Sequence, residues 1–345
     1  MAEARGKAVS GVEGYRRRSI AVPVFEANRM PILQLLSLTV PIFLLIGLGG
    51  VSVRAGFVTE SQIDGLAAFV LQFALPALVL GALAGQDLGR TFDWRYVAAY
   101  GAGSLLAFST AFSVLRFGLK RSLSAAAIGG MGGAASNTGF IGYPVTLLAF
   151  GPLALTAMPL NMMVENILII PLGLALAEAG SQNGASLGQT LATTARRLMR
   201  TPLILAILLG VLLSLLRLPI PGVVATAIDM LAKASAPCAL FVIGGTIATL
   251  RIPGSISGVA AEAGSIVACK LLLHPLAVGA AFFLIGGADP EMEKIGIVLA
   301  SVSMITVYPI FGARYGVGGV SSTVLVTATA IGFFTITAAL GIALG

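Results

Sequence analysis

Charged side chains are scarce in this sequence and make up 10% of its 345 residues. A soluble domain carries about 25% charged residues, because a polar shell must separate its core from water. Here 57% of the residues are hydrophobic and the mean hydropathy is +0.99. The net charge of +7 comes from short loops and the N-terminal tail, so it does not indicate a nucleic-acid partner. The composition indicates a polytopic membrane protein and excludes a soluble enzyme or a nucleic-acid-binding protein.

Cysteine and histidine are also rare, with two cysteines and one histidine. Cys238 and Cys269 lie inside apolar segments, where cysteine behaves as a small hydrophobic residue, so we expect no disulfide framework. His274 has no second histidine with which to share a metal, and the His-Glu-x-x-His motif of metalloproteases is absent. We therefore expect no metal site and no cofactor, and a hydrogen-bonded packing role for His274.

Long apolar runs, in contrast, are abundant. A helix crosses the hydrocarbon layer with about 20 apolar residues. Runs of this length alternate with short connections that leave no room for a separate soluble domain. We predict an all-α protein with ten spans at approximately residues 31–53, 64–85, 94–115, 123–149, 154–177, 202–218, 223–250, 257–285, 293–313 and 320–344.

Lysine and arginine predict the orientation, because cytoplasmic loops are richer in these residues. Loops after odd-numbered spans hold nine of them and loops after even-numbered spans hold four. We expect the richer side to be cytoplasmic, in the cell (inner) membrane, with both termini extracytoplasmic. Residues 1–29 carry six more basic residues and lack an apolar run of signal-peptide length. Either Met30 is the physiological start or this tail is a weakly structured extension.

Two pairs of spans indicate an internal repeat: spans four and nine, and spans two and seven. Residues 135–144 and 300–309 share Ala, Ser, Tyr and Pro at an offset of 165, which Gly151 and Gly316 continue. The prolines of spans two and seven are offset by 161. Five is an odd number, so two five-span halves must lie in opposite orientations. Chance matches among frequent small residues are the alternative.

This repeat divides the chain into four parts. They are a tail at residues 1–29, a first five-helix repeat at 30–178, a connecting loop at 179–201 and a second five-helix repeat at 202–345.

Spans four and nine are predicted to be broken helices that cross. Gly139 and Pro144 lie in span four, and Tyr308 and Pro309 in span nine. Proline removes a backbone donor, and irregular backbone is stable within a membrane only inside protein or around a water-filled cavity. Inverted repeats with broken helices are typical of secondary transporters, and half-helix N-termini favour an anion. Helix packing is the alternative reason for these glycines and prolines.

The segment Ser136–Pro144 resembles the fourth-span signature of the auxin efflux carrier family. Leu231–Phe241, Lys270–Pro275 and Tyr308–Gly316 are similar to that family's seventh, eighth and ninth spans. The similarity runs from about Met30 to the end of the chain. It implies ten spans, a crossover of two proline-broken helices and transport of organic anions, as in bacterial malonate and malate carriers and plant auxin exporters.

Two departures from the family narrow the implied substrate. The plant exporters have a long loop after span five, whereas here that loop is short, at about residues 178–201. Their crossover carries Asn in both halves, whereas Val302 and Ser303 stand at the second position here. The second departure favours a small carboxylate over auxin.

Four charged residues lie in the interior of the predicted spans, at least six residues from either end, and a charge at the bilayer centre costs about 2.5–3.5 kcal/mol. Glu165 is one helical turn from Asn161, and it could exchange a proton, hold a cation, donate a hydrogen bond when neutral or cap a broken helix end. Lys270 could neutralise an anionic substrate or offset the negative ends of half-helices. Asp229 and Lys233 are spaced to form an ion pair on one helix face.

Neutral polar side chains complete the expected substrate site. Asn137 is the strongest candidate, because an amide beside a helix break can reach a substrate. The predicted substrate-binding residues are Asn137, Ser136, Thr138, Asn161, Glu165, Ser303, Thr306 and Lys270, and the predicted break residues are Gly139, Pro144, Tyr308 and Pro309.

These features predict a secondary active transporter or uniporter for a small organic anion, such as a mono- or dicarboxylate or an auxin-like acid. It would work by alternating access, with coupling to H⁺ or Na⁺ left open. A cation/proton antiporter that uses Glu165 is the alternative, although Asn166 replaces the second acid typical of that class. An intramembrane aspartyl protease would need two aspartates, and only Asp229 is within a span. Membrane lipid surrounds the chain in this prediction, and small-residue helix faces would allow a homodimer.

Overall fold

The computed structural model describes residues 32–84, 93–181, 201–250 and 259–344. The predicted tail and most of the predicted connecting loop lie outside these residues. Every regular element in the described part of the chain is a helix, and the one strand-like contact there is an isolated bridge between Ser136 and Met304. The fold is therefore all-helical, as predicted.

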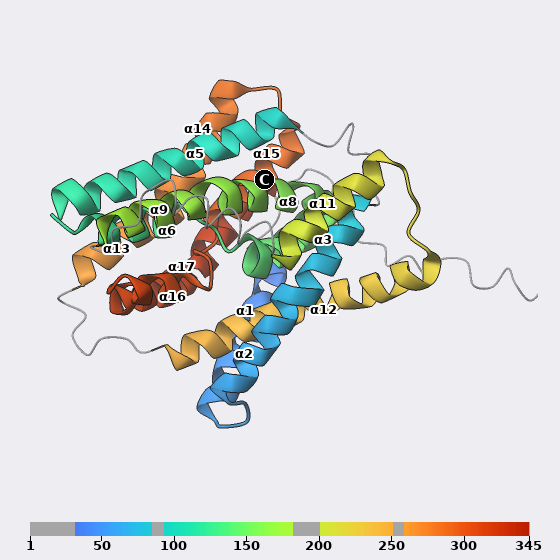
Figure 1. Ribbon diagram of the computed structural model, residues 1–345, viewed down its shortest axis with the longest axis horizontal. Helices are drawn as coiled ribbons and strands as arrows, with labels where there is room; N and C mark the ends of the chain where they lie inside the picture. The colour runs from blue at the N-terminus through green and yellow to red at the C-terminus, as the bar shows by residue number, and fades with distance from the viewer. Residues whose placement is uncertain (1–31, 85–92, 182–200, 251–258, 345) are drawn as a thin grey trace, which may run out of the picture.

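Long helices alternate with shorter ones along the chain (Figure 1). The η elements are π-helical turns, except η5, which is a 3₁₀ turn. In chain order the elements are α1 (Ile32–Arg54), α2 (Glu60–Phe69), η2 (Val70–Ala74), α3 (Leu75–Ala84), α5 (Trp94–Ser113), η3 (Val114–Gly118), α6 (Leu123–Ala134), η4 (Thr138–Gly142), α7 (Tyr143–Phe150), η5 (Gly151–Leu153), α8 (Ala154–Val164), η6 (Glu165–Ile169), α9 (Ile170–Gly180), α11 (Pro202–Leu215), α12 (Gly222–Thr249), α13 (Ala260–Ala268), η7 (Cys269–Leu273), α14 (His274–Ile285), α15 (Pro290–Ser301), α16 (Tyr308–Arg314) and α17 (Gly318–Leu344).

Seven helical stretches in the described residues are long and apolar enough to cross a membrane. One of them, Thr138–Gly180, has 43 residues, which is about twice the length that one crossing needs. Gly151, with a φ of +61°, ends α7 inside this stretch. α6 and α11 are apolar but shorter. The chain is thus a multi-pass membrane protein.

Four of the π-helical turns begin six residues before a proline. Proline cannot donate a backbone hydrogen bond, and its ring clashes with the carbonyl four residues earlier. A wider π turn accommodates both effects and displaces the following helix. The turns start at Val70, Thr138, Glu165 and Cys269, and the prolines are Pro76, Pro144, Pro171 and Pro275.

The helices gather into two groups that Figure 1 shows in different parts of the molecule. In the first, α1 packs against α12, and α3 packs against both α11 and α12. In the second, α5 packs against α6 and α14, while α17 contacts α13, α15 and α16. The helices α7 and α8 contact both groups. Two clusters of buried apolar side chains follow this division.

Glycines allow α1 to approach α12 closely. A Cβ atom on Gly49 would lie 2.0 Å from the Phe241 carbonyl oxygen, and one on Gly244 would lie 1.7 Å from the Ile46 carbonyl oxygen. The two backbones can touch only because these positions carry no side chain, as at other close helix contacts in membranes.

We therefore expect Gly244→Ala to lower the thermal unfolding midpoint of the purified protein in detergent. The two helices would have to separate, and such overpacking costs about 1–3 kcal/mol. Gly47→Ala is the control, since no atom lies within 4 Å of a Cβ built there. Equal midpoints for the two variants would contradict this account of the α1–α12 contact.

Candidate functional site

Two interruptions in helical structure meet inside the protein. Residues 135–137 separate α6 from η4, and residues 302–307 separate α15 from α16. The isolated β-bridge joins these two segments, and the Asn137 N–H donates to the Ser303 carbonyl at 2.8 Å. Backbone groups that lost their helical partners thus pair with each other, which buried polar groups require. We call this contact the crossing.

The predicted break residues lie just beyond the interruptions. Pro144 is in the first turn of α7, Tyr308 and Pro309 are in the first turn of α16, and Gly139 lies within η4. Pro309 fits the first turn of α16 because its missing N–H would have no partner within the helix there. Pro144, in contrast, follows the π turn η4 without a gap in the helix. The placement of the breaks at these residues is therefore corrected to residues 135–137 and 302–307.

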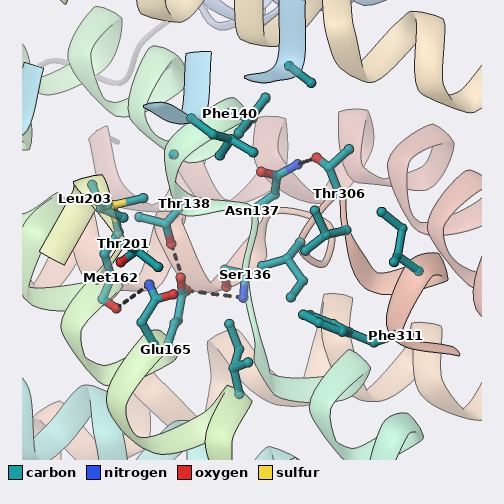
Figure 2. A pocket seen from close by; sticks show the side chains of 18 of the residues that line it. Ser136, Asn137, Thr138, Phe140, Met162, Glu165, Thr201, Leu203, Thr306 and Phe311 are labelled. Atoms are coloured by element: carbon teal, nitrogen blue, oxygen red, sulfur yellow. Dashed lines mark hydrogen bonds between the residues drawn. The ribbon is translucent and has the colours of Figure 1, made fainter. Parts of the chain in front are cut away.

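Glu165 holds the start of η4 from the π turn η6. Its Oε1 accepts hydrogen bonds from the Ser136 N–H at 3.2 Å and from Thr138 Oγ1 at 2.7 Å (Figure 2). The Tyr100 hydroxyl donates to the same oxygen at 3.2 Å. The residue is 3% exposed. A carboxylate at this place lies at the N-terminal end of η4, where the helix dipole favours negative charge.

Lys270 lies in the π turn η7 and is completely buried. Its Nζ donates to the Ala300 carbonyl in the last turn of α15 at 2.7 Å and to Ser136 Oγ at 2.8 Å. It also lies 2.8 Å from His274 Nδ1. A cation is favourable at this end of a helix. Ser136 therefore connects the two charges, because its N–H meets Glu165 and its hydroxyl meets Lys270.

Three side chains on one face of α5 complete this network, and the sequence analysis did not select them. The Tyr96 hydroxyl donates to Asn161 Oδ1 at 2.6 Å, and Ser104 Oγ lies 2.9 Å from His274 Nε2. Tyr100, between them, contacts both Glu165 and Ser136. The four-residue spacing of these polar groups places them on one helix face, and that spacing is the signal by which the sequence could have revealed them.

A cavity of about 850 Å³ ends at the crossing. Its walls come from α2, η2, α3, η4, α8, η6, α9, α11, α12 and residues 305–315. Asn137 Nδ2 donates to Thr306 Oγ1 at 2.8 Å beside it (Figure 2). Of the predicted substrate-binding residues, five line this cavity: Ser136, Asn137, Thr138, Glu165 and Thr306.

The other three predicted substrate-binding residues lie behind the cavity wall. Asn161 binds Tyr96, and the Ser303 carbonyl binds the backbone of Asn137. Lys270 is not among the residues that line the cavity and reaches it through Ser136. In this structure Lys270 thus lies at the C-terminal end of α15 and makes no direct contact with the cavity.

Charged side chains also border the far end of this cavity. Glu178 Oε2 accepts hydrogen bonds from Arg314 Nη2 at 3.2 Å and from the Tyr315 hydroxyl at 2.9 Å. The pair Asp229–Lys233 forms the expected ion pair on α12, but neither residue lines this cavity. Within the described residues, no group of three or more His, Cys, Asp or Glu side chains could hold a metal ion.

The family model described as "Membrane transport protein" matches residues 35–340. The chain belongs to this family, the auxin efflux carrier family of transporters. A relative from Rhizobium meliloti (strain 1021), described as a "Putative malonate transporter", is 30% identical over 299 residues, which cover 85% of this chain and 91% of the relative. The family resemblance noted in the sequence is thus confirmed, and the chain is a membrane transporter by family.

Removing Lys270 should destabilise this transporter. Lys270→Met leaves Ser136 and Ala300 without their donor and Glu165 without a nearby positive charge, and breaking a buried charge pair costs about 3–5 kcal/mol. We expect a lower thermal unfolding midpoint, and a smaller loss in Lys270→Met/Glu165→Gln than the two single variants predict together.

The control is Lys233→Met, since that lysine belongs to an exposed ion pair, and such a pair contributes about 0–1 kcal/mol. Additive losses in the double variant would show that Glu165 and Lys270 do not act as a pair.

Proposed function

We propose that this protein is a secondary active transporter or uniporter that moves a small organic anion by alternating access. The observation that carries this proposal is the cavity that ends at the crossing, where Asn137 and Thr306 meet the N-terminal end of η4. Amide and hydroxyl groups can bind a carboxylate, and backbone N–H groups at a helix start favour negative charge. Within this chemistry, the malonate name of the relative supports a mono- or dicarboxylate.

We propose further that the chain has ten spans in two inverted five-helix repeats, with the interrupted fourth and ninth spans at the crossing. Each predicted span overlaps at least one described helix. Two matched features support the pairing of the halves: α7 and α16 both begin with Tyr-Pro, and each is followed by a glycine with positive φ, Gly151 at +61° and Gly316 at +76°.

The orientation follows from the same proposal. The far end of the cavity is lined by Glu178, Thr201 and Arg314. Glu178 and Thr201 flank the connection after span five, and Arg314 lies at the end of span nine. That side carries the excess of lysine and arginine and is cytoplasmic in our proposal. The cavity then opens to the cytoplasm, and both termini are extracytoplasmic.

Charge balance supports proton coupling through Glu165. The buried site holds one acid, Glu165, and one base, Lys270, at opposite helix ends. A bound anion adds a negative charge beside Glu165 in a poorly solvated site, which is costly unless a proton neutralises one carboxylate. A cation/proton antiporter that uses Glu165 is the second candidate, and the sodium arm of the experiments below tests it.

We expect liposomes that contain the purified protein to take up radiolabelled malonate or a related carboxylate. Asn137→Ala and Thr306→Val should reduce this uptake at least tenfold, because both side chains line the proposed site. Thr323→Val is the matched control, since that hydroxyl bonds to the Gly319 carbonyl on α17, away from the cavity. Unchanged kinetics in Asn137→Ala, at normal folding and insertion, would contradict the site.

Uptake should rise as the pH falls on the side from which substrate enters, because protonated Glu165 accompanies the anion. Glu165→Gln mimics the protonated carboxyl, so this variant should exchange substrate across the membrane but lose the acceleration by acid. Transport is measured at fixed substrate, at several pH values, with and without sodium. An unchanged pH profile in Glu165→Gln would refute the coupling role, and a sodium requirement that Glu165→Gln removes would favour the cation-coupled alternative.

A further inference from the structure

A second cavity, of about 650 Å³, lies near the N-terminal half of α12. It is lined by α3, α7, α8, α12 and the connection between α11 and α12. Its lining includes Tyr143, directly after the π turn η4 that begins at the crossing. The proposed function as stated above makes no use of this cavity.

The two cavities share walls but use different parts of them. Along α12, Val242 and Thr246 line the first cavity, whereas residues 225–236 contribute to the second. The stretch from α2 to α3 is divided in the same way, with residues 64–75 on the first cavity and residues 78–84 on the second. The cavities therefore lie one after the other along the same seam between the helices.

A buried apolar layer separates the two cavities on that seam. Leu75 and Tyr143 are buried, as are Ala239 and Leu240 on the part of α12 between the two linings. All four belong to the same buried cluster. A layer of this kind closes a route while leaving space on both sides of it.

The second cavity also explains two charges that would otherwise lie within the membrane. Asp229 and Lys233 line it, and they stand about 10 Å and 16 Å along α12 from Gly222 at a rise of 1.5 Å per residue. Their side chains are 56% and 75% exposed. Facing hydrocarbon, each charge would cost about 2.5–3.5 kcal/mol. Met230, next to Asp229, is 68% exposed and lines neither cavity, as expected of a residue that faces lipid.

We propose that the second cavity is a water-filled vestibule that opens to the opposite side of the membrane and forms the other half of the substrate route. Lys233 attracts the carboxylate substrate there, and Asp229 holds the lysine against the wall by its ion pair. This inference rests on the proposed transport of an anion. It gives the Asp229–Lys233 pair a role in substrate entry or exit beyond the helix-face ion pair expected from the sequence.

Thiol labelling tests the position of the vestibule. Single cysteines are introduced as Ile228→Cys for the second cavity, Thr246→Cys for the first and Met230→Cys for the lipid face, in a Cys238→Ala/Cys269→Ala background. A charged, membrane-impermeant methanethiosulfonate is added to either side of sealed vesicles of known orientation. We expect Ile228→Cys to react from one side only, Thr246→Cys from the other side only, and Met230→Cys from neither. A maleimide added after denaturation in detergent should label all three, because every thiol is then in water and can ionise.

Two labelling results would overturn the inference. If Ile228→Cys is as unreactive toward the impermeant reagent as Met230→Cys, the cavity holds no water. If it reacts from the same side as Thr246→Cys, the two cavities are not opposite ends of one route. Carboxylate uptake by the unlabelled variants is measured separately, so absent uptake would count against the proposed function without deciding the accessibility result.

The charge of Lys233 is tested by transport from the vestibule side. Lys233→Gln should raise the KM for a dicarboxylate several-fold and weaken its salt dependence, with an unchanged maximal rate, because an exposed charge steers ligands and is screened by salt. Asp229→Asn keeps the lysine charge and removes the negative charge beside it, so this variant should not raise the KM. A purely architectural pair would instead make both variants equally less stable without a change in KM, and that result would contradict the role of Lys233.

Discussion

Two helix ends buried in the same place constrain the rest of this structure. An interrupted helix exposes backbone N–H and C=O groups, and a membrane interior offers them no water. Here the interruption after α6 meets the interruption after α15. Some backbone N–H and C=O groups of one segment therefore form hydrogen bonds with those of the other. Glu165 and Lys270 satisfy groups that remain at an N-terminal and a C-terminal helix end, respectively. Two side chains of opposite charge, Glu165 and Lys270, thus stabilise this irregular backbone.

The same arrangement gives the cavity its chemistry. Glu165 reaches the cavity wall, whereas Lys270 stays behind Ser136. A ligand at Asn137 therefore meets helix N–H groups and neutral donors first. The Glu165 carboxylate lies nearby, whereas the Lys270 ammonium is separated from the ligand by Ser136. In our proposal such a site favours an anion most when Glu165 is neutral, so that binding depends on the charge state of one side chain.

Much of this fold could be predicted from the sequence, because apolar runs of fixed length leave few alternatives in a membrane protein. Glycine and proline also indicated which helices are interrupted, but neither proline stands at a break. Pro309 is in the first turn of α16, and Pro144 lies within the helix that follows the first break. The position of the break depends on which backbone groups find partners across the crossing, and a single sequence does not contain that pairing.

Glu165 and Lys270 were found because charge is rare within a span. Tyr96 and Tyr100 were missed because a tyrosine in an apolar helix resembles an ordinary packing residue, and only their register against Asn161 and Glu165 reveals the network.

The central claim is that a carboxylate binds where the two interrupted helices cross. The most direct measurement is an experimental structure of the protein in lipid with bromomalonate, whose bromine is located by anomalous scattering. This account predicts a bromine peak in the first cavity within contact distance of Asn137 and Thr306, with residues 135–137 and 302–307 non-helical. A bromine peak away from this cavity, or continuous helices through both segments, would contradict it.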